Sequence, residues 1–266
     1  MGKNSLFRKL GKSAGDIAWV VGSIGGFLLL WQLSVSFTVI GTLMPGPFAV
    51  AATLMRSFAV PLGGHTIQEH AYYSFMRVII GYGTAVALGI SFGVGAGLSR
   101  WFRALFRPLF EMIRPIPTVA WIPLAILWFG VDEMSKYFIV FYGAFANVAL
   151  SVYQGILGVD PVLIGAARML GCSERQVTFK VMLPACIPYI FAGMQVGLSA
   201  GIMSVVVAEM IKSTEGIGWI IHAGQQNADM TQVLSGMVAL ALFGLLLATI
   251  LRRVERKMCA WSVRNT

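Results

Sequence analysis

Long apolar runs constrain this chain more than any other feature. A helix needs about 20 apolar residues to cross the hydrocarbon core of a bilayer. Six segments qualify: Ile17–Ile40, Val78–Leu98, Val119–Val131, Tyr137–Leu157, Ile187–Ile211 and Val233–Leu251. The composition agrees, because 57% of the residues are hydrophobic and 12% are charged, whereas soluble domains run at about 45–50% and about 25%. We therefore predict an all-α membrane protein with six transmembrane helices, folded as a single domain over residues 1–266.

The third apolar run is short, and two prolines precede it. We expect this span to extend back towards Ala104 with a kink at Pro115 and Pro117, because proline removes a helix hydrogen bond. Between the first two spans, Phe48–Phe58 and Thr66–Met76 are predicted to form short amphipathic helices, the second of which leads into the second span. No small-residue cleavage site follows the first run, so a cleavable signal peptide is not expected.

The positive charges predict the orientation of the chain. Six spans place both termini on one side, and that side would hold 16 of the 20 Lys and Arg residues. They are Lys3, Arg8, Lys9, Lys12, Arg100, Arg103, Arg107, Arg114, Arg168, Arg175, Lys180, Arg252, Arg253, Arg256, Lys257 and Arg264. Lys and Arg accumulate in cytoplasmic loops, so both termini are predicted to be cytoplasmic. The net charge of +9 then reflects topology and contact with anionic lipid, and no nucleic-acid partner is expected.

Small residues recur at every fourth position in two of the spans. They are Ala85, Gly89, Gly93 and Gly97 in the second span, and Gly193, Gly197 and Gly201 in the fifth. Small residues at this spacing let helix backbones approach closely in lipid. Close packing is the simpler interpretation, and a narrow path lined by backbone is the alternative.

The polar segment between the fourth and fifth spans contains the start and end signals of two helices. Asp160 is a good N-cap and Pro161 suits the first helical position. Gly171 suits the left-handed residue that ends a helix. Ser173 and Gln176 have the spacing of a capping box. We predict helix, tight turn, helix on the cytoplasmic face. Physical reasoning alone leaves open whether this unit docks another protein or rests on lipid.

Two short stretches of this segment resemble a known transporter motif. GAARMLG, from Gly165 to Gly171, is followed after nine residues by VMLP, which ends at Pro184. The pattern resembles the EAA loop of binding-protein-dependent ABC transporter permeases, here about residues 158–185. The resemblance implies coupling helices that sit in a cleft of an ATPase subunit. Coupling is then expected from Leu163, Gly165, Ala166, Ala167, Leu170, Gly171, Ser173, Gln176, Leu183 and Pro184. Gly165 stands where the motif has Glu, so a salt bridge of that Glu is not carried over.

Two further stretches resemble the taurine, aliphatic sulfonate and nitrate branch of that family. They are RPIPTVAWIPLAILWFG (Arg114–Gly130) and VVVAEMIKSTEGIGWII (Val205–Ile221), and the similarity begins at about Pro45. The resemblance implies a bacterial inner-membrane permease that works by alternating access. It also implies a second permease copy, two ATP-binding subunits that carry ATP and Mg, and an extracytoplasmic solute-binding protein. Taurine or another sulfonate is the expected solute, and nitrate, bicarbonate or a thiamine-precursor pyrimidine are the alternatives.

Polar side chains within the spans suggest a translocation path. Such groups are costly in lipid, so their placement is informative. Gln195, Ser199 and Glu209 share one side of the fifth span, and Asn147, Ser151 and Gln154 share a face of the fourth. The alternative is hydrogen bonding between helices. An acid would repel an anion, so Glu209 is expected as a gate or structural partner. It could instead snorkel to water beside Lys212.

Other function classes find little support in the sequence. Gly11-Lys12-Ser13 lacks the earlier glycine of a phosphate-binding loop, since Leu6 stands there, so no ATP site is expected on this chain. A secondary transporter usually carries several intramembrane carboxylates or histidines, and only Glu209 is a candidate. Cys172, Cys186 and Cys259 have neither zinc nor disulfide spacing. His65, His70 and His222 are interpreted as surface residues, and no enzyme or metal site is predicted.

Overall fold

Helices make up nearly all of the described chain. In the computed structural model, the backbone is described for residues 3–260, and side chains are described there except at residues 3–18, 40 and 212. The helices are α1 (Lys3–Phe37), α2 (Pro47–Arg56), α3 (Ile67–Leu98), α4 (Arg100–Ile113), α5 (Ile122–Phe129), α6 (Glu133–Leu157), α7 (Pro161–Met169), α8 (Glu174–Val177), α9 (Leu183–Lys212), α10 (Ile217–Gln226) and α11 (Met230–Met258). Three short turns complete them: the 3-10 turns η1 (Val39–Thr42) and η2 (Thr118–Trp121), and the π-helical turn η3 (Thr178–Met182). The all-α prediction is confirmed.

Five helical segments of the described chain are long and apolar enough to cross a membrane. They are Trp19–Phe37 of α1, all of α3, all of α6, the continuous run Glu174–Ile211, and α11. A sixth span results if α4 is taken together with η2 and α5, which are bent by 97° relative to α4. The bend lies at Pro115 and Pro117, so the kink predicted in the third span is confirmed.

The helix predicted over Thr66–Met76 leads directly into the second span, as expected, because α3 runs without interruption from Ile67 to Leu98. The other helix predicted before this span, Phe48–Phe58, corresponds to α2. Thr66 and Glu69 form a capping box at its start, in which the Thr66 backbone N–H donates to the Glu69 carboxylate at 2.6 Å. Glu69 in the first turn is exposed and caps the helix, whereas Arg77, directly after this part, is buried and paired with Glu133. The polar first turns of α3 and its apolar membrane-spanning part therefore form one continuous helix.

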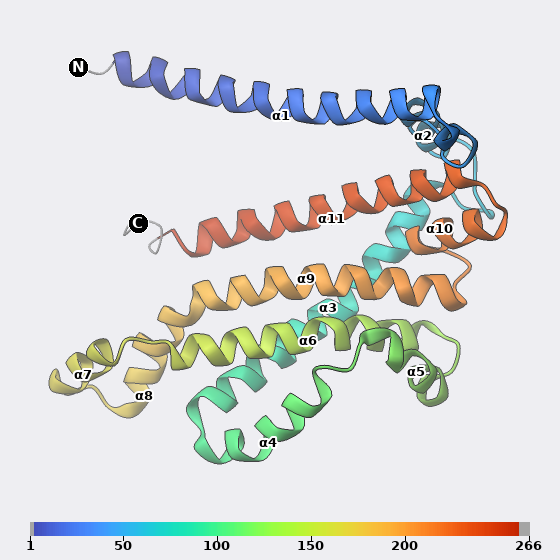
Figure 1. Ribbon diagram of the computed structural model, residues 1–266. Coiled ribbons are helices and arrows are strands. Elements are labelled where there is room, and N and C mark those ends of the chain that lie inside the picture. The colour runs from blue at the N-terminus through green and yellow to red at the C-terminus, as the bar shows by residue number, and fades with distance from the viewer. Residues whose placement is uncertain (1–2, 261–266) are drawn as a thin grey trace.

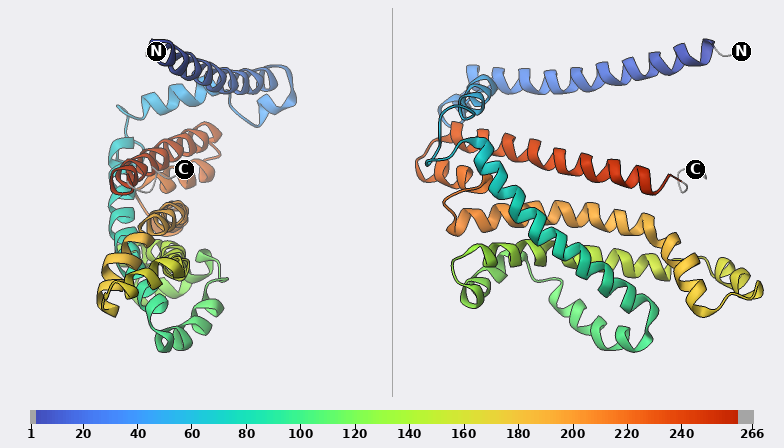
Figure 2. Two further views of the ribbon diagram at one scale, coloured as in Figure 1. Left: turned by 90° about the vertical axis from the view of Figure 1, so that its left-hand side faces the viewer. Right: turned by 180° about the vertical axis from the view of Figure 1, so that it is seen from behind.

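The core of the bundle is α6, against which α3 and α9 both pack (Figures 1 and 2). A methyl group added at Gly93 of α3 would lie 2.6 Å from the Ala149 carbonyl oxygen of α6. One added at Gly197 of α9 would lie 2.8 Å from a methyl group of Val148. The small-residue stripes are thus occupied by neighbouring helix backbone and side chains. Close packing, the simpler interpretation of these stripes, accounts for them.

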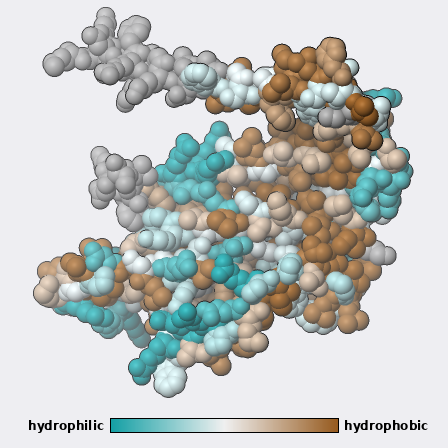
Figure 3. Space-filling model, in the orientation of Figure 1, coloured by the Kyte–Doolittle hydropathy of each residue, from teal (hydrophilic) through white to brown (hydrophobic). Residues whose placement is uncertain are grey.

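The two ends of the bundle differ in their surface. In Figure 1, α7 and α8 project at one end, where α1 begins and α11 ends, and α5 and α10 lie at the other. We name these the elbow end and the α10 end. Hydrophilic residues gather over the half that includes the elbow end, and hydrophobic residues dominate the other half (Figure 3). Some residues named above lie outside the described part: the side chains of Lys3, Leu6, Arg8, Lys9, Gly11, Lys12, Ser13 and Lys212, and the whole of Arg264.

Candidate functional site

The turn between α7 and α8 follows from its local sequence. The Asp160 carboxylate accepts a hydrogen bond from the Val162 N–H at 2.8 Å, which caps the start of α7. At its end, the Gly171 N–H donates to the Arg168 carbonyl and the Cys172 N–H donates to the Ala167 carbonyl. This pair of bonds is a Schellman motif. It needs a left-handed residue, and Gly171 has φ +80°. The predicted N-cap and helix end are both confirmed.

The second helix of this unit is also capped as predicted. The Ser173 hydroxyl accepts from the Gln176 N–H, and the Gln176 side chain accepts from the Ser173 N–H at 2.8 Å. From here α8, η3 and α9 follow one another without a loop. We call residues 160–184 the elbow. Its second arm is therefore the start of the long helix α9.

Side-chain contacts hold the two arms of the elbow together. The Arg168 guanidinium donates to both oxygens of the Glu174 carboxylate, at 2.8 and 3.0 Å. This hydrogen bond raises the pKa of Arg168. Ala167 and Val177, with 8% and 1% of their surfaces exposed, are the buried anchors. The elbow is thus a folded unit rather than a flexible loop.

The tip of the elbow exposes large apolar side chains. Met169 and Leu170 are each 85% exposed, and Val162 is 74% exposed. In Figure 3, hydrophobic residues accordingly lie at the projecting tip, next to hydrophilic ones. Of the predicted coupling residues, Ala167 is buried; Gly165, Ala166, Leu183 and Pro184 are half-buried; and Leu163, Leu170, Gly171, Ser173 and Gln176 are exposed.

A second cluster of functional groups lies at the α10 end, inside the protein. Arg77 of α3, with 1% of its surface exposed, is its centre. Its guanidinium donates to Glu133 of α6 at 2.7 and 2.8 Å, to Glu209 of α9 at 2.9 Å, and to the Glu215 carboxylate at 3.1 Å. Lys136 of α6 also donates to Glu133, at 2.7 Å. We call these five residues the ion cluster. It joins three helices and the loop between α9 and α10.

Polar groups around the ion cluster satisfy the remaining hydrogen bonds of Glu209. Its carboxylate accepts from the Ser74 hydroxyl at 2.7 Å and from the Gly218 N–H at 2.8 Å. His70 accepts from the Gly216 N–H at its Nδ1, while its Nε2 lies 2.9 Å from the Leu62 carbonyl. A buried charge is tolerated only when it is paired and hydrogen-bonded, and the bonds from Ser74 and Gly218 help Glu209 to meet that condition. The His70 bonds instead satisfy backbone groups of Gly216 and Leu62.

The ion cluster corrects two sequence predictions. The sequence allows the Glu209 side chain to reach water beside Lys212, but Glu209 is 1% exposed and pairs with Arg77. His70 was interpreted as a surface residue, but it is 0% exposed and stacks on Trp219. Sequence reasoning missed Arg77 because its partners lie far away in the chain. The available signal was a set of unpaired charges, Arg77, Glu133 and Glu209, at the same ends of three predicted spans.

The residues predicted to form a translocation path do not converge on one cavity of this chain. Gln195 donates to Glu255 of α11, and the Ser199 hydroxyl donates to the Gln195 carbonyl at 3.3 Å. Ser151 lies against Gly193 in the α6–α9 contact, while Asn147 donates to the Gly143 carbonyl. Glu209 is enclosed in the ion cluster. The path therefore stays a prediction. Among the described residues, no group of three or more His, Cys, Asp or Glu could hold a metal ion.

Comparison with known proteins agrees with this architecture. The taurine transport system permease protein TauC of Escherichia coli is 33% identical over 244 residues, which cover 91% of this chain and 88% of TauC. The bicarbonate transport system permease protein CmpB of Synechococcus elongatus is 28% identical over 250 residues, with coverages of 90% and 87%. A chain of the MetNI methionine ABC transporter, solved in inward-facing conformations, shares the fold with a TM-score of 0.62 at 18% identity. That alignment covers 71% of this chain and 94% of the MetNI chain.

A family of membrane transport proteins matches most of the helical core of this chain. Residues 85–258 match the family described as the binding-protein-dependent transport system inner membrane component. The match begins in α3 and includes α4–α11, so both the elbow and most of the ion cluster lie within it. The chain therefore belongs to this family of ABC importer permeases.

Proposed function

We propose that this chain is the permease of an ATP-driven importer that passes a small sulfonate, such as taurine, into the cytoplasm. Two copies form the pathway, two ATP-hydrolysing subunits dock on the elbows, and a solute-binding protein delivers the solute from outside. The elbow and both termini face the cytoplasm, which agrees with the excess of Lys and Arg at the elbow end. The chain itself is not an enzyme; ATP and Mg act on the partner subunit.

The exposed apolar tip of the rigid elbow carries this proposal. Met169, Leu170 and Val162 project beyond the bundle on a unit whose arms are already capped and paired. Contiguous exposed apolar surface on a folded unit marks an interaction site. A helix that rests on lipid lies in the membrane plane with its apolar face at the headgroup boundary, whereas the elbow projects beyond the end of the bundle. A protein cleft is the better match.

The connections of the elbow are suited to transmitting motion. α8 continues through η3 into α9, and α7 follows α6 after three residues in which Val159 is buried. α6 and α9 pack closely on each other through Gly193 and Gly197. A displacement of the docked elbow would therefore move both helices together. This is the coupling that alternating access requires.

The similarity to TauC favours a sulfonate as solute. A bicarbonate importer is the second candidate, since CmpB is 28% identical over a comparable length. The cognate solute-binding protein separates the two. We expect taurine or an alkanesulfonate to raise its melting temperature, and bicarbonate to leave it unchanged. The reverse result would replace the sulfonate by bicarbonate and leave the coupling role intact.

The coupling role is tested with Leu170→Asp in vesicles that contain the permease, its ATPase and its binding protein. Because Leu170 is 85% exposed, the change should leave the melting temperature of the permease unchanged. It places a charge in the docked interface, so we expect at least a ten-fold loss of solute-stimulated ATP hydrolysis. Gly171→Arg should have the same effect.

The matched control is Met258→Asp, which introduces the same charge at an exposed site of the elbow end, at the end of α11. Its stimulated hydrolysis should equal that of the unmodified protein. Normal coupling in Leu170→Asp, or equal loss in both variants, would contradict docking through the elbow.

A further inference from the structure

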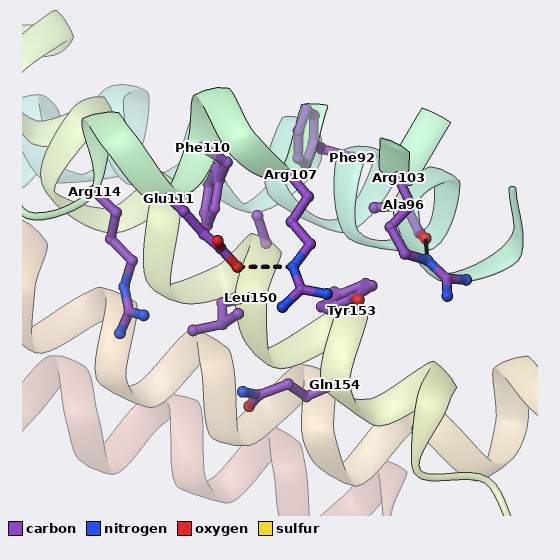
Figure 4. A pocket seen from close by; sticks show the side chains of 11 residues that line it. Phe92, Ala96, Arg103, Arg107, Phe110, Glu111, Arg114, Leu150, Tyr153 and Gln154 are labelled. Atoms are coloured by element: carbon purple, nitrogen blue, oxygen red, sulfur yellow. Dashed lines mark hydrogen bonds and ion pairs between the residues drawn. The ribbon is translucent and has the colours of Figure 1, made fainter. Parts of the chain in front are cut away.

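A groove rich in arginine lies between α4 and α6. It has a volume of about 260 Å³ and is lined on one side by Arg103 and Arg107 of α4 and by Arg114, which caps the C-terminal end of α4. Figure 4 shows these arginines leaving α4 on the side that faces Leu150, Tyr153 and Gln154 of α6. Phe92 and Phe110 form part of its apolar wall. The groove is separate from the elbow and from the ion cluster.

The arginines of this groove differ in how many of their N–H groups already bond to other residues of the chain. Arg103 donates to the carbonyls of Ala96 and Gly97, at 3.0 and 2.8 Å, and so caps the end of α3. Arg107 donates through its Nε to Glu111 at 2.7 Å, which leaves its two terminal nitrogens free for another acceptor. Arg114 has no hydrogen-bond or ion-pair partner among the described residues. Glu111 is the single carboxylate of the lining, so the groove carries a net charge of about +2.

Topology alone does not explain this arrangement. Arginines that only orient a helix can point in any direction, and Arg107, with 60% of its side chain exposed, and Arg114 do remain in contact with water. Here the opposite face of α4 exposes Trp101, Leu105 and Met112, while its arginines border a hollow with aromatic walls. Arg107 and Arg114 are seven residues apart, so they lie on one face of the helix about two turns from each other. Their free N–H groups can approach one ligand from two directions.

We infer that this groove binds a small oxyanion of the sulfonate or phosphate type. Guanidinium groups present paired N–H donors that match two oxygens of such an anion. Two sources carry this chemistry: a soluble sulfonate on the elbow side of the path, or the phosphate of an anionic lipid. The inference rests on the proposed function for the first source. Gln154, which lines the groove, is also the last member of the polar strip predicted on the fourth span.

A soluble sulfonate fits the groove in size and electrostatics. A volume of about 260 Å³ lies just below the usual range for small-molecule sites, which begins at about 300 Å³. An anion that enters a cell moves against an interior-negative potential. A positive groove near the elbow end lowers the energy of the anion there. The site would therefore hold the solute after it has passed the core of the bundle.

The test uses the full chain in nanodiscs of neutral phosphatidylcholine, with methanesulfonate as the probe and saturation-transfer NMR as the readout. We expect saturable binding that is weakened about ten-fold or more by the double change Arg107→Gln and Arg114→Gln, because each removes a charge-assisted hydrogen bond. Arg107→Lys with Arg114→Lys keeps the charge but loses the planar fork, so an intermediate affinity is expected. Arg253→Gln with Arg256→Gln, an equal charge change at exposed sites of α11, should bind as the unmodified chain does.

A second arm identifies the source of the oxyanion. The same variants are purified from phosphatidylglycerol-containing membranes, and the retained lipid is measured by native mass spectrometry. Loss of methanesulfonate binding with unchanged lipid retention supports a solute site. Loss of lipid retention alone assigns the groove to lipid and ends its link with the solute. No saturable binding of either oxyanion, or equal binding in all variants, overturns the inference.

These outcomes are separate from those of the proposed function. Binding to the chain in nanodiscs needs neither the ATPase nor the elbow, so Leu170→Asp should bind methanesulfonate normally. Failure of coupling with intact binding would reject the elbow and keep the groove. Failure of binding with intact coupling would reject the groove as an oxyanion site and keep the elbow as the docking site. The melting temperature of each arginine variant shows whether it has folded.

Discussion

The elbow and the ion cluster are built on opposite principles. Each hydrogen bond and ion pair that shapes the elbow joins residues a few positions apart, the longest being Arg168 with Glu174. In the ion cluster, Arg77 bonds to Glu209, which lies 132 residues further on. The elbow is exposed and apolar at its tip, whereas the cluster is charged and has Arg77 and Glu209 buried at its centre. The elbow can therefore keep its shape while it moves, because its contacts are local. The ion cluster instead holds together helices that are distant in the sequence.

This difference suggests a division of labour within the proposed importer. A partner that pushes on the elbow would move α6 and α9 at one end. At the other end, Glu133 of α6 and Glu209 of α9 are both held by Arg77 of α3. The ion cluster would then act as the fixed end against which the helices tilt. The following changes test the two regions, beginning with the one that should cost most.

Arg77→Met should be the most damaging of these changes. It leaves Glu209 buried without its cation, and removal of one partner from a buried pair costs about 3–5 kcal/mol. We expect this loss in the free energy of unfolding, measured by SDS titration in mixed micelles. Hydrogen exchange should also rise in the loop between α9 and α10, because Arg77 donates to the Glu215 carbonyl there.

Two controls separate the buried pair from charge alone. Arg56→Met removes an exposed arginine of α2, and a surface substitution of this kind should cost less than about 0.5 kcal/mol. Adding Glu209→Met to Arg77→Met removes the orphaned carboxylate and should recover part of the stability. A double variant that is less stable than Arg77→Met would show that packing, rather than an unpaired charge, causes the loss.

The same contrast decides what the sequence could predict. The elbow was predicted almost residue by residue, because caps and left-handed glycines are read from neighbours: Asp160, Gly171 and Ser173 all act as expected. The kink in the third span was also local, since prolines cause it. For Glu209, local spacing pointed to Lys212, whereas the true partner comes from another helix. That pairing depends on how α3 and α9 pack on α6, which no local pattern encodes.

Gly171→Ala should have an intermediate effect, confined to the elbow. An alanine at φ +80° is strained, and the left-handed conformation costs a residue with a side chain roughly 1–2 kcal/mol. Hydrogen exchange of the Gly171 and Cys172 amides should accelerate by about ten-fold, because about 1.4 kcal/mol corresponds to that factor. The stability of the whole bundle should hardly change.

Gly165→Ala is the matched control, since a methyl group added there meets no atom within 4 Å and the residue is helical. It should slow exchange in α7, because alanine favours a helix by up to about 1 kcal/mol over glycine. Equal acceleration in both variants would mean that the Schellman turn does not hold the elbow.

Glu174→Gln should have the smallest effect, even though it breaks a two-bond ion pair. Both partners are more than half exposed, and exposed pairs contribute little because water and salt screen them. Exchange in the elbow should rise slightly at low salt, and the difference from the unmodified chain should vanish at about 1 M salt. The same change at Glu133, which receives two bonds from Arg77 and one from Lys136, should lower the unfolding free energy and persist in salt. If Glu174→Gln instead destabilised the chain as much as Glu133→Gln, the Arg168–Glu174 pair would support the whole bundle, and the contrast between a locally held elbow and a long-range ion cluster would fail.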